Sequence, residues 1–284
     1  MKFAERYQDI LKRNKAFLDV HLTNRCNLNC CCCQRLSPLC DSETDYTFDE
    51  FKNDFDKILK FPDFNELEII SFSGGEPLVN PDFFKIIKYV RKFYKGKIDV
   101  LSNGIKVLQF SDDEINFIKN NVDSFRITRY YNSNINYKKI IQRLPFVTFF
   151  NSGESEVEKR ITVIKQFFNT REIPKIFQKT RCNCSTVILY KTRFFNCPQV
   201  LVAPFANKNF NLKYEEEFLK LSEINSFNSL YKKLQETPIK LCKFCSIDYY
   251  KNSMKWKISS RQRNEFVNDK LFNVFQDRVN FKKI

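Results

Sequence analysis

Two hydrophobic periods alternate along the first half of the chain. Short apolar runs, typical of strands, recur between segments whose apolar residues return every three or four positions, which is typical of helices. We expect strands at residues 16–23, 67–72, 97–101, 122–130 and 146–150. We expect helices at residues 1–15, 47–59, 81–94, 111–120, 135–143 and 154–169. This alternation predicts a parallel sheet with crossover helices, an α/β fold that curls into a partial (β/α)6-type barrel.

The pattern changes after residue 175. Residues 187–190 and 193–196 predict a short hairpin, and residues 214–235 predict a helix. We therefore expect two units: a core domain at residues 1–175, and a small C-terminal hairpin-and-helix module with a tail at residues 176–284. The chain has no run of about eighteen apolar residues and no apolar leader, so we expect a cytoplasmic protein without a membrane partner.

Composition narrows the chemistry. The 284 residues include 11 Cys but a single His, His21. An odd number of cysteines in a chain without a leader favours metal or cluster binding over disulfides. With one His, zinc sites with mixed Cys and His ligands and iron sites with two His ligands are almost excluded. Metal chemistry in this chain must therefore use thiolates.

The formal net charge of +15 has three competing explanations. A compositional bias toward Lys, Asn, Ile, Phe and Tyr would produce it without any functional reason. An anionic small-molecule substrate ranks second. Nucleic acid ranks third, because the basic residues are spread along the chain and form no stripe.

Three cysteines in C-x3-C-x2-C spacing follow the first expected strand: Cys26, Cys30 and Cys33. Three thiolates from one loop can hold three corners of a cubane iron–sulfur cluster and leave its fourth iron open to a small molecule. Two more motifs follow the next strands, SGGEP at residues 73–77 and SNG at residues 102–104. Since the carboxyl ends of parallel strands meet at one edge of a sheet, we expect these motifs to converge there.

Together, TNRCNLNCCCC, SGGEP and SNG on successive strands resemble the radical S-adenosylmethionine (SAM) superfamily. The resemblance implies a [4Fe–4S] cluster whose open iron binds SAM and which, reduced by a donor such as flavodoxin or ferredoxin, cleaves SAM to a 5′-deoxyadenosyl radical. That radical takes a hydrogen atom from the substrate. The alternative for the three cysteines is a structural zinc loop or reactive thiols. Cys32 stands where the family usually has an aromatic residue near the adenine, so the adenine contact stays unassigned.

The resemblance also implies which residues contact SAM. They are Gly74, Gly75, Glu76, Pro77, Ser102, Asn103 and Thr128. The first four form the loop that receives the methionine amino group, the next two touch the ribose or methionine, and the last is a polar contact on a later strand. Without the resemblance, a Gly-Gly or Asn-Gly pair would be only a turn. Arg126 and Arg129 rank below Thr128 as candidates, for the methionine carboxylate.

On the first expected strand, Asp19, His21 and Thr23 share a face. If that face points inward, the three side chains line the substrate cavity. For His21 we favour the alternative of a hydrogen-bonded core histidine over a catalytic one.

Five further cysteines lie far from the first three: Cys182, Cys184, Cys197, Cys242 and Cys245. Four of them could enclose a second cluster, and their order resembles the auxiliary-cluster module called twitch, a shorter relative of the SPASM module. We expect Cys184, Cys197, Cys242 and Cys245 as ligands of a second [4Fe–4S] cluster. Cys182 is almost as good a candidate as Cys184, and a four-cysteine structural zinc is the alternative. The expected hairpin lacks the glycine that the family often has in its turn.

The resemblance thus implies an oxidoreductase that dehydrogenates a small, anionic, sugar- or nucleotide-like substrate, with the auxiliary cluster as electron acceptor. Modification of a peptide or protein is the first alternative. A non-catalytic iron–sulfur or zinc protein that binds nucleic acid is the second, and it would make SGGEP a coincidence.

Overall fold

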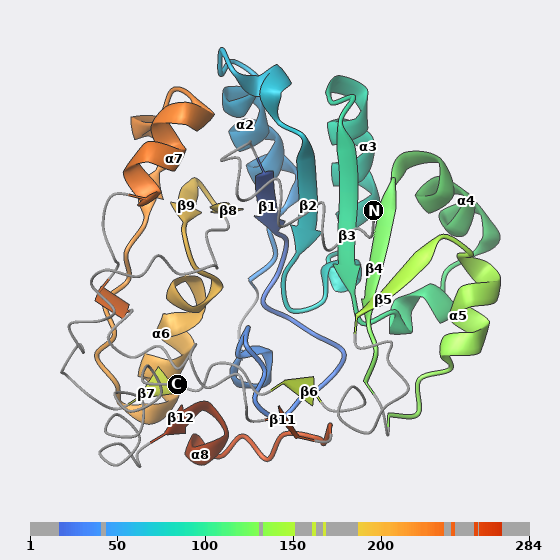
Figure 1. The fold of residues 1–284 in the computed structure, drawn as a ribbon, viewed down its shortest axis with the longest axis vertical. Coiled ribbons are helices and arrows are strands. Elements are labelled where there is room, and N and C mark those ends of the chain that lie inside the picture. Colours follow the sequence, from blue (N-terminus) through green and yellow to red (C-terminus); the bar gives the residue numbers. More distant parts are fainter. Residues whose placement is uncertain are drawn as a thin grey trace, which may run out of the picture.

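An open, mostly parallel sheet of eight strands forms the centre of the molecule (Figure 1). In this computed structural model, the described residues are 17–40, 44–130, 133–150, 161–162, 167–168, 187–235, 240–241, 253–254 and 256–268. The order of the strands in the sheet is β10-β9-β8-β1-β2-β3-β4-β5. Every neighbouring pair from β8 to β5 is parallel, so the predicted parallel α/β fold is confirmed, as a sheet that does not close into a barrel.

The sheet strands are β1 (Phe17–His21), β2 (Ile69–Ser73), β3 (Lys97–Ser102), β4 (Ser124–Thr128), β5 (Val147–Phe150), β8 (Val187–Tyr190), β9 (Arg193–Phe195) and β10 (Leu219–Lys220). The helices are α2 (Phe48–Ile58), α3 (Phe83–Phe93), α4 (Asp112–Asn121), α5 (Tyr137–Arg143), α6 (Pro198–Phe210), α7 (Phe227–Gln235) and α8 (Arg263–Phe266). Two small sheets pair β6 (Ile161–Thr162) with β11 (Ser253–Met254), and β7 (Phe167–Phe168) with β12 (Val267–Asn268).

Side-chain hydroxyls cap the N-termini of two core helices, at the positions expected from the sequence. Thr47 precedes α2 and Ser111 precedes α4, and each forms a capping box with the glutamate three residues later. The Thr47 hydroxyl accepts from the Glu50 amide at 3.3 Å, while the Thr47 amide donates to the Glu50 carboxylate at 3.0 Å. Such caps satisfy amides that the first helical turn leaves without a partner.

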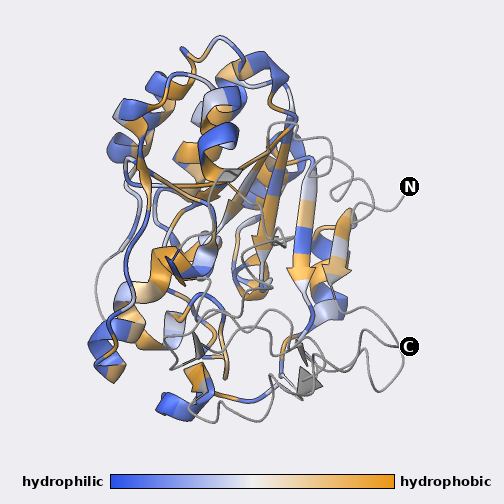
Figure 2. Cartoon of the chain, turned by 60° about the vertical axis from the view of Figure 1, so that its left-hand side comes forward, coloured by the Kyte–Doolittle hydropathy of each residue, from blue (hydrophilic) through white to orange (hydrophobic). Residues whose placement is uncertain are grey.

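One face of the central strands is apolar, and the opposite face carries a row of polar side chains. Leu18 of β1 is fully buried in the main hydrophobic cluster, together with side chains of α2, α3 and α4. The alternating residues Asp19 and His21 point to the opposite face. The register continues this polar row, since Asp19 pairs with Ser71 on β2 and Ser71 pairs with Asp99 on β3. Figure 2 shows hydrophobic residues concentrated in the strands, with hydrophilic stretches on the surrounding helices.

The expected hairpin forms and continues the main sheet, because β8 pairs in parallel with β1. Lys191 and Thr192 take the two turn positions with φ of 45° and 62°, the left-handed conformation that glycine usually supplies. The buried carboxylate of Asp54 accepts from the Thr192 amide at 2.7 Å and thereby holds this turn. The boundary near residue 175 stays a prediction, since residues 169–186 lie outside the described part.

Two expected helices differ from the structure, and a third is not tested by it. The helix expected at residues 214–235 begins only at Phe227, because Leu219 and Lys220 pair with β9 instead. The helix expected at residues 154–169 is wrong at 161–162 and 167–168, which are strand pairs. The helix expected at residues 1–15 lies outside the described residues. Helix α6, in turn, has no counterpart among the expected helices.

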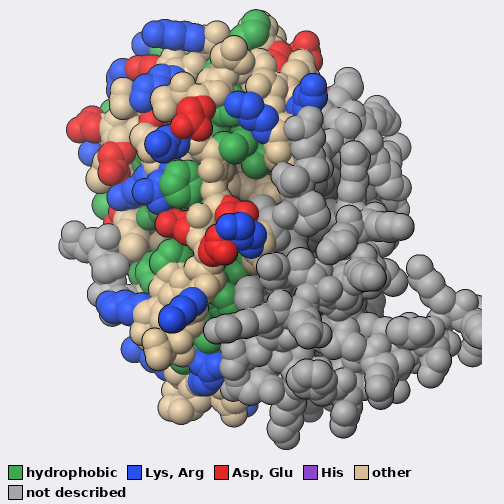
Figure 3. All heavy atoms as spheres, turned by 90° about the vertical axis from the view of Figure 1, so that its left-hand side faces the viewer, with side chains coloured by type: hydrophobic (Ala, Val, Ile, Leu, Met, Phe, Trp, Pro, Cys, Tyr) green, Lys and Arg blue, Asp and Glu red, His purple; other side chains and the backbone are tan. Residues whose placement is uncertain are grey.

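The surface shows no single basic stripe on the face that is visible in Figure 3, where Lys and Arg side chains alternate with Asp and Glu across the described residues. Within the same described residues, none of the helices has the length and apolar character needed to cross a membrane.

Candidate active site

The cysteine loop begins where β1 ends and is fastened to the loop that follows β2. The Gly75 amide donates to the Thr23 carbonyl at 2.7 Å, and the Glu76 amide donates to the Arg25 carbonyl at 2.9 Å. The Thr23 hydroxyl accepts from the Arg25 amide at 3.0 Å. The cysteine and SGGEP motifs are therefore packed together at the carboxyl ends of the strands.

Gly74 and Gly75 are required for this packing. A Cβ on Gly74 would lie 2.5 Å from the Thr23 carbonyl oxygen, and one on Gly75 would lie 2.6 Å from the Asn24 carbonyl oxygen. Gly74 also has a φ of +153°, which other residues rarely adopt. The atoms that come closest to these two glycines are backbone atoms of the cysteine loop. A contact between these glycines and SAM stays a prediction.

The thiols of Cys26, Cys30 and Cys33 lie close enough to influence one another. Burial raises the pKa of the Cys30 thiol to about 12 and raises that of Cys26 as well, and the neighbouring thiols add to both shifts. Buried thiols of this kind stay protonated until a bound metal supplies the compensating positive charge. The loop is therefore suited to ligate a cationic metal centre.

Hydrogen-bond donors surround these sulfurs. The Leu28 amide donates to Cys26 Sγ at 3.3 Å, and the Trp256 indole donates to Cys30 Sγ at 3.2 Å. Thiolate ligands of iron–sulfur clusters accept such bonds. In the described part of the chain, no three His, Cys, Asp or Glu side chains are grouped so that they could hold one metal ion. A cubane cluster binds each thiolate at a different iron and so fits three thiols that are spread around a loop.

A segment from far along the chain covers the cysteine loop. Cys30 forms an antiparallel bridge with Ile258, and the Cys31 amide donates to the Lys257 carbonyl at 3.0 Å. This bridge brings Trp256, the single tryptophan of the chain, to the Cys30 sulfur. The cover is thus built by strand pairing as well as by side-chain contact.

Tyr130 lies on the same side of the loop, just after β4. Its ring centroid is 6.3 Å from that of Trp256, and its side chain lies close enough to Cys30 to influence the pKa of that thiol. Burial raises the pKa of Tyr130 well above its ordinary value, and the three neighbouring thiols of the loop raise it further. Two aromatic side chains, of which Trp256 donates a hydrogen bond, therefore lie beside Cys30.

Glu76 connects the second and third motifs to the cysteine loop. Its carboxylate accepts from the Ser102 hydroxyl at 2.8 Å and from the Asn103 amide at 2.7 Å. The Asn103 side chain in turn donates to Asn27 Oδ1 at 2.8 Å and lies 3.7 Å from Cys26 Sγ. Burial raises the pKa of Glu76 to about 7. Glu76 is only 1% exposed, so it holds the motifs together from within.

The other predicted residues have different fates. Pro77 begins a short 3-10 turn (Pro77–Val79) that continues the glycine loop. Thr128 is the last residue of β4, half-buried, and follows the position that pairs with Ser102. Cys197 is half-buried at the start of α6. The remaining predicted ligands of the second cluster lie outside the described residues: Cys182, Cys184, Cys242 and Cys245.

His21 is fully buried and neutral. Its Nε2 lies 2.8 Å from Asn24 Oδ1 and its Nδ1 lies 3.3 Å from the Arg35 guanidinium. Because an arginine can only donate, Nδ1 accepts and Nε2 carries the proton. Burial and the Arg35 charge lower the pKa of His21 well below its ordinary value. His21 is therefore the hydrogen-bonded core histidine that the sequence favours.

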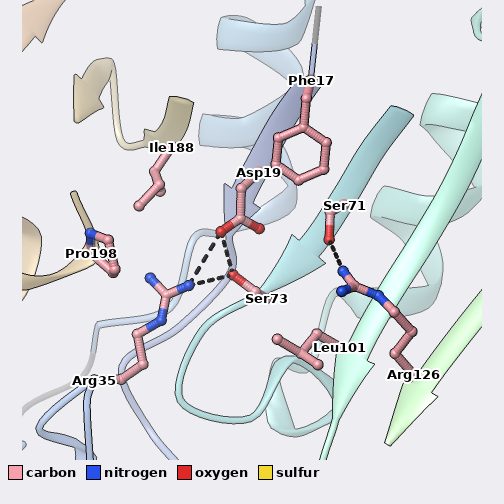
Figure 4. Close-up of a pocket in the computed structure, with 9 residues that line it drawn as sticks. All are labelled: Phe17, Asp19, Arg35, Ser71, Ser73, Leu101, Arg126, Ile188 and Pro198. Carbon is pink, nitrogen blue, oxygen red and sulfur yellow. Dashed lines mark hydrogen bonds and ion pairs between the residues drawn. The ribbon is translucent and has the colours of Figure 1, made fainter. Parts of the chain in front are cut away.

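A cavity of about 120 Å³ lies on the polar face of the sheet, and Arg35, the partner of His21, lines it (Figure 4). Two sets of residues lie at this cavity, each with an aspartate, a serine and an arginine. The first set lines the cavity with all three residues, and the second set lines it with its serine and arginine only. In one set, the Ser73 hydroxyl and the Arg35 guanidinium donate to Asp19 Oδ2 at 2.8 and 3.2 Å. The lining residues that matter below are Asp19, Arg35, Ser71, Ser73, Leu101 and Arg126.

In the second set, Arg126 is already paired. Its guanidinium donates to both oxygens of Asp99, with Nε at 2.8 and 2.9 Å, and the Ser71 hydroxyl donates to the same carboxylate at 2.8 Å. Asp99 is completely buried. Arg129 instead packs over the rings of Tyr137 and Phe149. Arg126 is therefore paired within the sheet, and the ranking of Thr128 above it as a SAM ligand stays a prediction.

Sequence reasoning missed the roles of Arg35 and Trp256. Arg35 comes two residues after Cys33, and its reach back to β1 carries no periodic signal. Trp256 is the single tryptophan of the chain, which marks it as unusual but does not place it beside Cys30.

Comparison with known proteins agrees with this geometry. Residues 20–145 match the family model described as the radical SAM superfamily. A curated relative, 7,8-dihydro-6-hydroxymethylpterin dimethyltransferase of Methanocaldococcus jannaschii, is 29% identical over 113 residues. The match covers 38% of this chain and 20% of that protein, so it spans only a fifth of the relative.

Solved structures extend the comparison to the fold. BtrN in complex with AdoMet and 2-DOIA has a TM-score of 0.51 and 13% sequence identity, covering 81% of this chain and 92% of that chain. SuiB of Streptococcus suis, bound to its precursor peptide SuiA, has a TM-score of 0.39 and 14% identity, with 90% and 79% covered. The likeness to BtrN confirms the open α/β fold. The family match runs from the end of β1 to α5, and over these residues, 20–145, the chain is similar to the radical SAM superfamily.

Proposed function

We propose that Cys26, Cys30 and Cys33 hold a [4Fe–4S] cluster and that the chain is a radical SAM oxidoreductase acting on a small molecule. The observation that carries this proposal is the packing of the three-thiol loop, the glycine loop and the Glu76–Asn103 contact at one edge of the sheet, beside a polar cavity. When bound, the cluster supplies the electron that cleaves SAM to the 5′-deoxyadenosyl radical.

The residues of the chain prepare that site. The Leu28 amide and the Trp256 indole donate to the cysteine sulfurs and so favour their thiolate form. Glu76 holds Asn103 against the loop. The SAM contacts that we propose remain those of the sequence: Gly74, Gly75, Glu76, Pro77, Ser102, Asn103 and Thr128.

The reaction that we propose is a dehydrogenation. A carbon that bears a hydroxyl or amine loses a hydrogen atom to the deoxyadenosyl radical, then one electron to a second acceptor and one proton to solvent or a base. The carbon–oxygen or carbon–nitrogen single bond thereby becomes double. A small molecule fits the cavity of about 120 Å³ better than a peptide does, and BtrN, whose fold is similar, was solved in complex with a small molecule, 2-DOIA.

The acceptor in this proposal is the second cluster. Cys197 packs against a hydrophobic cluster to which Leu241, the residue before Cys242, also belongs. This shared cluster supports the pairing of the two cysteine segments in one auxiliary site, completed by Cys245 and by Cys184 or Cys182. Reduction of the first cluster would come from a flavodoxin or a ferredoxin.

Anaerobic reconstitution tests both sites. The protein is loaded with iron and sulfide, the two are counted, and 5′-deoxyadenosine is measured after addition of SAM and dithionite. A Cys26→Ala/Cys30→Ala/Cys33→Ala variant should lose about four irons per chain and all 5′-deoxyadenosine. A Cys197→Ala/Cys242→Ala/Cys245→Ala variant should lose a similar amount of iron but still cleave SAM.

Cys31 and Cys32 provide the matched control. Their thiols contact each other at 3.4 Å. The charges of Lys257 and Glu265 influence the pKa of both thiols. A Cys31→Ala/Cys32→Ala variant should therefore keep its iron and its cleavage of SAM. If this variant loses both while the triple variant keeps them, the assignment of ligands is wrong. Zinc in place of the second group of irons would remove the electron acceptor and with it the oxidation.

A further inference from the structure

The cavity on the polar face differs from an ordinary buried ion-pair network in one respect. Of its two aspartate sets, only one is complete. Both oxygens of Asp99 accept hydrogen bonds from Arg126, and one also accepts from Ser71. In the other set, Asp19 Oδ2 accepts from Ser73 and Arg35, but Asp19 Oδ1 is buried with no hydrogen-bond partner among the described residues.

An unpartnered carboxylate oxygen is costly in this position. Asp19 is 5% exposed, so bulk solvent reaches little of its side chain. Burial accordingly raises the pKa of Asp19, although Arg35 opposes the shift. Figure 4 shows Asp19 facing the cavity between Phe17, Ser71 and Ser73. A ligand that supplies one donor at this oxygen would remove the cost.

The charges of the cavity are balanced. Arg35 is paired with Asp19, and Arg126 is paired with Asp99. An anionic ligand would have to compete with these two carboxylates for the guanidinium groups, and it would be repelled by both. A neutral ligand meets neither competition nor repulsion, and an ammonium group is attracted by the open oxygen of Asp19 although the two guanidinium groups oppose it. The net charge of the whole chain therefore does not describe this cavity.

The geometry points to a substrate class, and we propose that the cavity binds an unphosphorylated polyol or amino sugar whose hydroxyl or ammonium group donates to Asp19 Oδ1. This inference rests on the proposed function for its chemistry but not for the binding itself. One water needs about 10–15 Å³ of such space, so the cavity of about 120 Å³ takes on the order of ten non-hydrogen atoms. That is the size of one sugar ring.

Binding can be measured apart from catalysis. Saturation-transfer NMR on the anaerobically reconstituted holoprotein with SAM, at millimolar sugar, uses glucose, myo-inositol and glucosamine as probes, and glucosamine 6-phosphate as the anionic comparison. We expect at least one unphosphorylated probe to bind more tightly than the phosphate. Asp19→Asn should weaken that binding by about 10- to 100-fold, because a hydrogen bond to a charged group is lost.

Two further variants keep the result interpretable. Leu101→Phe fills the cavity without changing any charge and should abolish binding even if Asp19→Asn is poorly folded. Asp56→Asn, on the outer side of α2 where Asp56 pairs with Lys52, is the matched control and should bind like the unmodified protein. Tighter binding of glucosamine 6-phosphate, no binding of any unphosphorylated probe, or unchanged binding in Asp19→Asn and Leu101→Phe would each overturn the proposal.

SAM cleavage on the same samples separates the two proposals. If 5′-deoxyadenosine forms with dithionite but no unphosphorylated sugar binds, the inference about the cavity fails and the proposed function stands. If a sugar binds through Asp19 but no 5′-deoxyadenosine forms, the proposed function fails and the sugar site stands.

Discussion

The buried pair between Arg126 and Asp99 should be one of the most sensitive points of the fold. Asp99 is 0% exposed and Arg126 is 7% exposed, so Arg126→Met leaves a carboxylate in the sheet with only the Ser71 hydroxyl as a donor. Removing one partner of a buried ion pair typically costs about 3–5 kcal/mol. With a urea dependence of about 3 kcal/mol per molar, the unfolding midpoint should fall by about 1–1.7 M.

A double-mutant cycle isolates the cause. Asp99→Asn combined with Arg126→Met removes the uncompensated charge and should recover a large part of the lost stability. Arg193→Met is the surface control, since Arg193 and Glu216 are 43% and 37% exposed, and it should cost at most about 1 kcal/mol.

Urea unfolding, followed by circular dichroism on the cluster-free protein, measures all four variants. Equal losses for Arg126→Met and Arg193→Met would refute the reasoning. So would a double variant that loses the sum of the two single losses, because the two groups would then be energetically independent.

Three other predictions follow from the site. Trp256→Phe removes the donor to Cys30 Sγ and should lower the reduction potential of the cluster, measured by EPR-monitored titration; an unchanged potential would mean that this bond does not reach the metal. Glu76 has a pKa raised from 4.5 to about 7, so the folded state binds more protons than the unfolded state between these pH values. The contribution of Glu76 to stability should be fully present below pH 4.5 and should fall by about 3 kcal/mol as the pH rises through 7. Glu76→Gln should remove this pH dependence in unfolding measurements on the cluster-free protein. Gly75→Ala would drive a Cβ into the backbone near Asn24 and should cost about 1–3 kcal/mol of stability together with bound iron, and retention of both would contradict the close packing.

Local signals account for most of the first 150 residues. The caps at Thr47 and Ser111, and the alternation of apolar residues in the strands, are read within a few positions of the chain. The topology that places the cysteine, SGGEP and SNG motifs at one edge follows from parallel strands alone. This is why the fold and the convergence of three motifs could be predicted.

The rest depends on contacts between distant residues. Helix α6 is buried on most sides and contains Pro204, so it has neither a helical period nor a uniform propensity. Neither the open oxygen of Asp19 nor the reach of Arg35 follows from sequence spacing. Whether a polar side chain on a strand has all its hydrogen bonds depends on which side chain of another loop lies beside it.

The contact between Trp256 and Cys30 joins residues that are 226 positions apart. At about 5–20 residues per second, a ribosome needs about 10–45 s to synthesise the intervening chain. During that interval the cysteine loop and its neighbouring strands have been made while the covering segment has not. We expect an iron–sulfur carrier to find the thiols most accessible on the nascent chain, and the pairing of Cys30 with Ile258 to seal the loaded loop afterwards. The order of translation would thus serve as the order of assembly.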